Sequence, residues 1–251
     1  MRWFGLHALG LGAVLLVAAC QSDTSELPEN ADAAAPQPPD AGQEPAGCRT
    51  PAGFTTPRSV DDVVAWLNAL PRPVTLPCFL ESLPAALQIQ ATQSIVSAQP
   101  AVGARSPRMF IVMDPLIASV VPAGDGARLL ELGERRGDAQ SLKAELEFPI
   151  EHELNALSPY ERLRFNDEAS TCDFCHANSE PAPGLNYPFA QISDALRPRP
   201  SERIALVRVL EQVRTCDAAQ EPDRCALLRA LFDRSPVPVE AEFPPGYDTF
   251  F

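Results

Sequence analysis

Three closely spaced side chains, Cys172, Cys175 and His176, carry the clearest chemistry in this sequence, within Cys172-Asp173-Phe174-Cys175-His176. Two thiols at this spacing can add to the two vinyl groups of a haem, and the adjacent imidazole can ligate its iron. In a chain of this composition the pattern arises by chance only about 0.002 times. We therefore expect one covalently bound haem c, with His176 as the proximal iron ligand.

Two other uses of a Cys-X-X-Cys pair are less well supported. A redox-active pair normally opens a helix after a strand in a thioredoxin-like fold, and that order of elements does not precede Cys172. A zinc site needs a second close pair of Cys or His residues, which the sequence lacks. Haem attachment is the favoured prediction.

The sixth iron ligand decides what such a haem can do, and no Met or His follows His176. The upstream candidates are Met109, Met113 and His152. Both Met side chains share a strand face with Ile111, so core packing is their alternative role. His152 lies between two Glu residues, and the alternatives are a solvated side chain, an iron ligand or a distal acid–base group. If none of them ligates, the iron is five-coordinate and open to small molecules.

Other residues near the motif could shape the haem environment. A backbone carbonyl within 181–184 is expected to accept a hydrogen bond from the His176 ring and fix its tautomer. Aromatic side chains could cover the porphyrin faces or belong to the ordinary core. These are Phe165, Phe174, Tyr187 and Phe189.

The remaining cysteines indicate an exported, disulfide-bonded protein. Cys216 and Cys225 flank a short acidic loop between two predicted helices, so their pairing is the simplest. Cys48 and Cys78 are then the remaining pair, although parity alone leaves other connectivities open.

The N-terminal 47 residues are not expected to belong to the folded body. Residues 1–19 have the charged, apolar and small-residue order of a secretory signal, and the segment Leu16-Val17-Ala18-Ala19-Cys20 resembles the bacterial lipobox. The resemblance implies lipidation of Cys20, the alternative being an ordinary signal peptide. Residues 20–47 are rich in Pro, Ala and acidic residues and predict a disordered tether. Gln21, in place of Asp, implies a cell-envelope location at the outer membrane by resemblance to enteric lipoproteins.

Composition narrows the classes of partner. The chain has 33 acidic and 20 basic residues and a formal net charge of -13, so nucleic-acid binding is not expected. An acidic surface would instead suit a basic redox partner. The apolar content and the 27 Pro residues exclude a coiled coil and a multi-span membrane protein.

Residues 48–251 are expected to form a single globular α+β domain. A helix is predicted from the Ser59 cap to Leu70, and an antiparallel β-meander follows, before the haem-attachment segment. A C-terminal helical hairpin is predicted after a long Pro-rich loop at 181–200. The predicted strands lie within 86–98, 109–121, 128–134 and 142–150, and the hairpin helices at 201–215 and 223–232.

A β-meander before a late Cys-X-X-Cys-His resembles the cytochrome c′-beta family and its haem–lysine cross-linked relatives over residues 86–190. The resemblance implies an antiparallel-sheet protein with a reactive or gas-binding haem. In the cross-linked relatives a strand Lys attaches to the haem, and Lys143 is the one Lys in this sequence. Lys143 alternates on the same strand face as Glu145 and Glu147, which predicts a solvated face.

Three functions are compatible with the sequence. The leading hypothesis is a membrane-anchored mono-haem c-type cytochrome that transfers single electrons at the cell envelope, a carrier rather than a catalyst. The first alternative is a five-coordinate haem enzyme or gas-binding protein with peroxide or nitrogen-oxide chemistry. The second is a haem-free, disulfide-stapled lipoprotein scaffold in which Cys172 and Cys175 are joined.

Overall fold

The computed structural model describes residues 48–167 and 169–249, which all belong to one compact unit. The predicted signal sequence, Cys20, Gln21 and the predicted tether lie outside these residues. Among the described helices, none has the length and apolar character needed to cross a membrane.

Two helices open the body. Helix α1 (Val60–Ala69) begins where predicted, because the Ser59 hydroxyl accepts a hydrogen bond from the Asp62 backbone N–H in a capping box. Its Val60 N–H donates to the Glu134 carboxylate at 3.0 Å, which ties the helix to the sheet. Helix α2 (Leu76–Ser82) follows, capped by Thr75. Trp66 of α1 is fully buried and donates to Ser82, so the two helices share one core.

A mixed nine-stranded sheet forms the centre of the molecule, and the α+β class is confirmed. The predicted antiparallel meander is formed by consecutive pairs from β1 to β5. The predicted strand at 109–121 is two strands, because Asp114 and Pro115 form the turn of a hairpin. These strands are β1 (Gln88–Thr92), β2 (Arg108–Met113), β3 (Leu116–Val120), β4 (Leu129–Arg136) and β5 (Gln140–Glu147).

The second half of the chain adds short elements at both edges of the sheet. The loop predicted at 181–200 contains strands, and the helix predicted from Ser201 starts only at Leu206, because Arg203 and Ile204 pair with β1. In the first half of the chain, a short helix η1 (Asp125–Arg128) precedes β4. The elements of the second half are α3 (Ser158–Glu161), η2 (Thr171–Phe174), β6 (Glu180–Pro181), β7 (Gln191–Asp194), β8 (Leu196–Arg197), η3 (Pro200–Glu202), β9 (Arg203–Ile204), α4 (Leu206–Arg214), α5 (Pro222–Phe232), β10 (Val239–Glu240) and β11 (Asp248–Thr249).

The predicted C-terminal helical hairpin is not confirmed as the final unit of the fold. Both α4 and α5 are helices, but the chain then returns to the strands: β10 pairs with β1, and β11 pairs with β8. Phe243 and Tyr247 in this returning segment pack with Phe110 of β2. The C-terminal segment therefore covers part of one face of the sheet.

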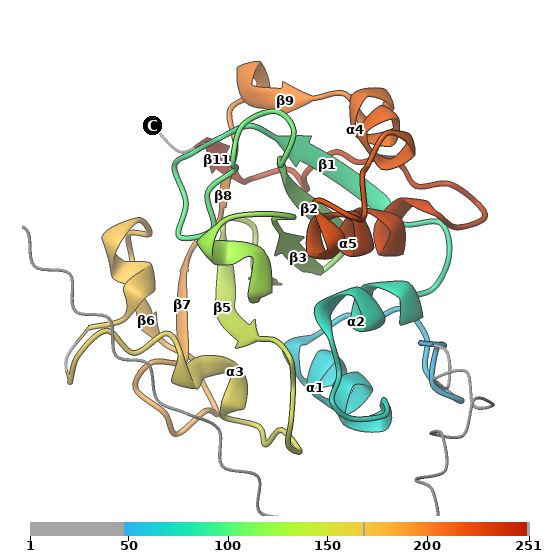
Figure 1. The fold of residues 1–251 in the computed structure, drawn as a ribbon. Helices are drawn as coiled ribbons and strands as arrows, with labels where there is room; N and C mark the ends of the chain where they lie inside the picture. Colours follow the sequence, from blue (N-terminus) through green and yellow to red (C-terminus); the bar gives the residue numbers. More distant parts are fainter. Residues whose placement is uncertain (1–47, 168, 250–251) are drawn as a thin grey trace, which may run out of the picture. The chain divides into compact units, whose positions relative to one another are not determined.

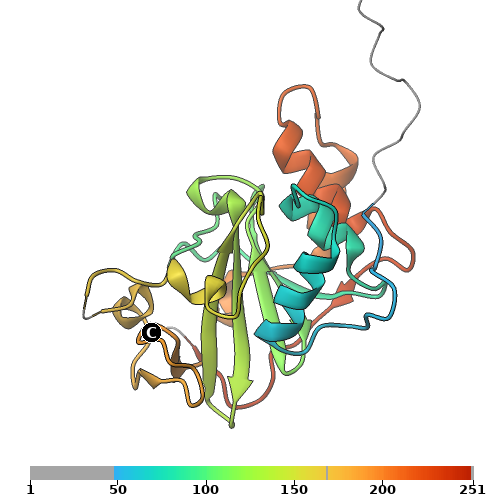
Figure 2. The same cartoon turned by 90° about the horizontal axis from the view of Figure 1, so that it is seen from below.

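The two faces of the sheet have different partners. Figure 2 shows α1 and α2 on one side and the chain around η2 and β6 on the other. Met109, Ile111 and Met113 of β2 belong to the large core on the helix side. Arg108 and Phe110 alternate to the opposite side, as the period of two in a strand requires. The second side carries the candidate site described below.

Both predicted disulfides are present. Cys48 joins Cys78, and Cys216 joins Cys225, with Cα atoms 5.0 Å and 5.7 Å apart. The second disulfide joins Cys216, just after α4, to Cys225 of α5. Figure 1 shows these two helices next to each other.

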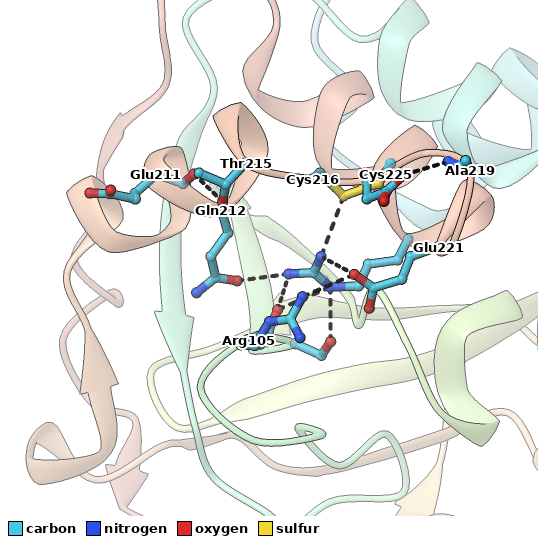
Figure 3. Close-up of a disulfide and its surroundings, with 11 residues drawn as sticks. Arg105, Glu211, Gln212, Thr215, Cys216, Ala219, Glu221 and Cys225 are labelled. Carbon is cyan, nitrogen blue, oxygen red and sulfur yellow. Dashed lines mark hydrogen bonds and ion pairs between the residues drawn. A yellow bond between two sulfur atoms is a disulfide. The ribbon is translucent and has the colours of Figure 1, made fainter.

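A buried guanidinium reinforces the second disulfide. Arg224 donates to the Gln212 side chain at 3.0 Å, to the Glu221 carboxylate at 3.3 Å and to the backbone carbonyl of Arg105. Figure 3 shows Gln212, Glu221 and Arg105 gathered beside the disulfide. This cluster fastens α4 and α5 to the loop that precedes β2.

Candidate functional site

A cavity on the face of the sheet opposite the main core brings together the three motif residues. Its lining includes Cys172, Cys175 and His176, together with side chains from β2, β4 and β5 and the loop after β1. The strand side chains on this wall include Arg108, Phe110, Glu131 and Lys143. The fold therefore places the whole Cys-X-X-Cys-His motif against one side of the sheet.

The motif adopts a short turn rather than the start of an α-helix. Ser170 caps η2: its hydroxyl accepts from the Cys172 N–H at 3.0 Å, and its own N–H donates to the Asp173 carboxylate at 2.8 Å. The His176 N–H then donates to the Cys172 carbonyl at 2.9 Å, which closes the turn around both thiols. This local network sets the positions from which Cys172, Cys175 and His176 reach the cavity.

Cys172 and Cys175 are the two unpaired cysteines of the described chain. Cys172 is partly buried and Cys175 is exposed. Burial raises the pKa of the Cys172 thiol, so it is not an activated thiolate of the kind that redox-active pairs carry. Both sulfur atoms are free to form thioethers.

One hydrogen bond fixes the tautomer of His176. Its Nδ1 lies 2.7 Å from the backbone carbonyl oxygen of Asp194, and because a carbonyl can only accept, Nδ1 carries the proton. Nε2 is then the nitrogen with the free lone pair. Burial lowers the pKa of His176 to about 4, so the imidazole is neutral at physiological pH. A carbonyl partner was predicted, but within 181–184; Asp194 supplies it because β7 runs past the motif.

These residues fit a covalently attached haem. Covalent c-type attachment uses two unpaired thiols and a neutral imidazole. It also needs the nitrogen of that imidazole that does not bind iron to be hydrogen-bonded, here Nδ1 to a backbone carbonyl. The described residues contain no group of three or more His, Cys, Asp or Glu side chains placed to hold a metal ion by themselves.

The predicted solvated environment of Lys143 is wrong. Its relative exposure is only 9%, and its Nζ donates to the Ser141 hydroxyl at 2.6 Å and to the Asp194 carbonyl at 3.0 Å. The strand alternation was correct, but the polar face is covered by the motif segment and by Leu196. Lys143 therefore lies in the wall of the candidate site.

Lys143 should leave a signature in the pH dependence of stability. Burial lowers its pKa to about 8, whereas an unfolded chain titrates its lysines near about 10.4. Between these values the unfolded state binds a proton that the folded state lacks, so the free energy of unfolding rises with pH, by up to about 3 kcal/mol. Lys143→Met should lose this rise, measured by urea denaturation at about pH 7 and about pH 10. If the free energy of unfolding changes with pH in the same way in the wild type and in Lys143→Met, the pKa of the Lys143 amine is not lowered in the folded protein.

An ion pair forms another part of the cavity wall. The Arg108 guanidinium donates to a Glu131 carboxylate oxygen and, at 2.8 Å, to the Ser119 hydroxyl, and it lies 4.6 Å from the centre of the Phe110 ring. The second carboxylate oxygen of Glu131 is buried without a hydrogen-bond partner among the described residues. A buried acceptor left without a partner is costly, because no hydrogen bond offsets the loss of its hydration.

The other predicted ligands lie elsewhere. Met109 and Met113 face the large core on the far side of the sheet, and His152 is exposed in the loop after β5. The structure does not bring these three residues together with His176 at the cavity. Phe165 and Phe174 form an edge-to-face pair at 4.8 Å that is exposed by 58% and 67%, and Tyr187 packs against Phe189.

Sequence reasoning missed Arg108, Glu131 and Asp194 as site residues. A usable signal existed for the first two, because they and Lys143 are polar members of alternating strands in the same meander, where β3 lies between β2 and β4 and β4 pairs with β5. No such signal exists for Asp194, whose contribution is a backbone carbonyl that any residue would provide.

Comparison with known proteins adds no family: no family model, no curated protein and no solved structure matches this chain.

Proposed function

We propose that the protein is a c-type haem protein that holds one haem in this cavity through thioethers to Cys172 and Cys175, with the His176 Nε2 as proximal iron ligand. One observation supports this most strongly. The chain pairs its other four described cysteines but leaves these two thiols free, at a cavity where a carbonyl orients the adjacent imidazole.

The cavity favours a five-coordinate iron over a closed one. The candidate sixth ligands Met109 and Met113 face the opposite side of the sheet, and His152 is exposed in the loop after β5. When bound, a haem with an open position supplies binding and redox chemistry for small molecules such as peroxide or nitric oxide. The reactive or gas-binding haem protein is therefore the function that the geometry supports best.

The polar wall provides what a small oxygen- or nitrogen-containing molecule needs. Arg108 can donate a hydrogen bond to a bound oxygen atom, and its pairing with Glu131 holds the guanidinium in one orientation. Phe110 and Leu132 add apolar surface to the lining beside these groups.

Single-electron transfer stays as the second candidate because the motif is near the surface. Cys175 is exposed and Phe174, inside the motif, is 67% exposed, so an attached haem would have an edge close to solvent. The acidic chain would suit a basic redox partner. The haem-free scaffold is disfavoured, because it needs a Cys172–Cys175 disulfide and both thiols are unpaired.

The envelope location and the lipid anchor at Cys20 are part of the same proposal. They rest on the lipobox-like segment and agree with the two disulfides, since both disulfides and covalent haem are made outside the cytoplasm.

Carbon monoxide binding separates the two candidate functions. The reduced protein, purified from an export-competent host with haem maturation, should be high-spin and bind carbon monoxide rapidly and completely. Met109→Leu and Met113→Leu should leave the spectrum unchanged, because these side chains point away from the cavity. A low-spin spectrum that carbon monoxide does not alter, and that changes in one of these variants, would overturn the open-site proposal in favour of the carrier.

A further inference from the structure

A single backbone carbonyl, that of Asp194, accepts hydrogen bonds from two donors in the candidate site. The His176 Nδ1 lies at 2.7 Å and the Lys143 Nζ at 3.0 Å. Lys143 has one further acceptor, the Ser141 hydroxyl at 2.6 Å. A cationic donor thus shares an acceptor with the ring that we assign to the iron.

The position of Asp194 is fixed by three separate groups of contacts. Its N–H donates to the Ala177 carbonyl at 3.1 Å, and its carboxylate accepts from the Asn178 side-chain amide at 2.9 and 3.1 Å. In β7 it is in register with Gln140 of β5. Because both the motif loop and the sheet hold it, the carbonyl cannot turn toward one donor and away from the other.

The two donors therefore compete for the same electron density. A carbonyl oxygen has two lone pairs and can accept two hydrogen bonds. When one donor is charged, it draws electron density from the oxygen, and the hydrogen bond from the second donor becomes weaker. The hydrogen bond on the outer nitrogen of a metal-bound His sets the orientation and basicity of that ligand. Removing Lys143 would strengthen the His176 hydrogen bond and increase the electron donation of the ring to the iron.

We propose that Lys143 is a positioning residue that adjusts the proximal ligand His176 through the shared carbonyl of Asp194. This inference rests on the proposed haem attachment and adds to it. It gives the buried amine a role that requires no contact with a bound small molecule.

The direct test is Lys143→Met, which keeps the length of the side chain and removes the donor. In the reduced holoprotein, the iron–histidine stretching band seen by resonance Raman should move to higher frequency. The reduction potential should fall, since a more basic ligand favours the ferric state. A tenfold shift in the ferric-to-ferrous ratio corresponds to about 59 mV for one electron.

Ser141→Ala is the charge-neutral companion. It removes the other acceptor of Lys143, so the amine should bind the Asp194 carbonyl more strongly and weaken the His176 hydrogen bond. The iron–histidine band should then move to lower frequency, opposite to its movement in Lys143→Met. This variant also serves if Lys143→Met fails to fold.

Glu145→Gln controls for simple charge effects. Glu145 lines the same cavity and accepts a hydrogen bond from Arg162, and it has no hydrogen bond to Asp194 or Lys143 in the structure. The variant should raise the reduction potential and leave the iron–histidine band in place. A band that stays in place in both Lys143→Met and Ser141→Ala, in protein that contains covalent haem, would overturn the inference alone. Absence of haem from the wild-type protein would instead overturn the proposed function.

Discussion

The double variant Cys172→Ala/Cys175→Ala is expected to contain no covalently bound haem when it is produced with an active haem maturation system. Both thioether bonds come from these sulfur atoms, and the other four described cysteines are held in disulfides. Pyridine haemochrome spectra after acid-acetone extraction measure the loss. Each single variant should keep one thioether and lose only part of the haem.

Removing the Cys216–Cys225 disulfide provides the matched control. Cys216→Ala/Cys225→Ala also deletes two sulfur atoms and lowers stability, but this pair does not line the cavity. It should therefore keep covalent haem at the wild-type ratio. Equal haem loss in both double variants would indicate unfolding rather than attachment, and covalent haem that persists without Cys172 and Cys175 would refute the assignment.

Loss of the Cys48–Cys78 disulfide is expected to cause the largest change in stability. The bond closes a loop with a sequence separation of 30 residues, and loop-closure entropy assigns it about 3.6 kcal/mol. For a body of this size the melting temperature should fall by roughly 7 to 14 °C. Cys48→Ser/Cys78→Ser measured by calorimetry tests this value.

The shorter loop gives the internal comparison. The Cys216–Cys225 bond spans 9 residues and should contribute about 2.6 kcal/mol in the same model. The decisive result is which of the two disulfide variants loses more unfolding free energy. A greater loss of stability from the shorter loop would mean that the Arg224 cluster, which contacts the Cys216 sulfur at 3.4 Å, dominates over chain entropy there.

Local signals in the sequence predicted local structure well. The Ser59 capping box starts α1, the turn residues separate the strands of the meander, and proximity of the cysteines identified both disulfides. Each of these features depends on residues close together in the chain or on a short list of pairings.

The sequence did not predict in the same way which distant segments of the chain pack over the sheet or pair with its strands. Lys143 alternates as a polar strand residue should, yet residues of the motif segment and of β8 cover its face. Arg203 and Ile204 fit the helix predicted from Ser201, yet they pair with β1 as a short strand. The carbonyl of Asp194 has no side-chain signature, so the hydrogen bond that orients His176 depends on how β7 passes the motif.

Covalent attachment of haem at the Cys-X-X-Cys-His motif can be measured on the wild-type protein. Wild-type protein from an export-competent host is extracted with acid-acetone, and the pyridine haemochrome spectrum of the precipitated polypeptide is recorded. We expect one haem per chain to stay with the polypeptide, on the peptide that contains Cys172 and Cys175. A colourless polypeptide would mean that the chain attaches no haem, and would leave a disulfide-bonded protein with two free thiols.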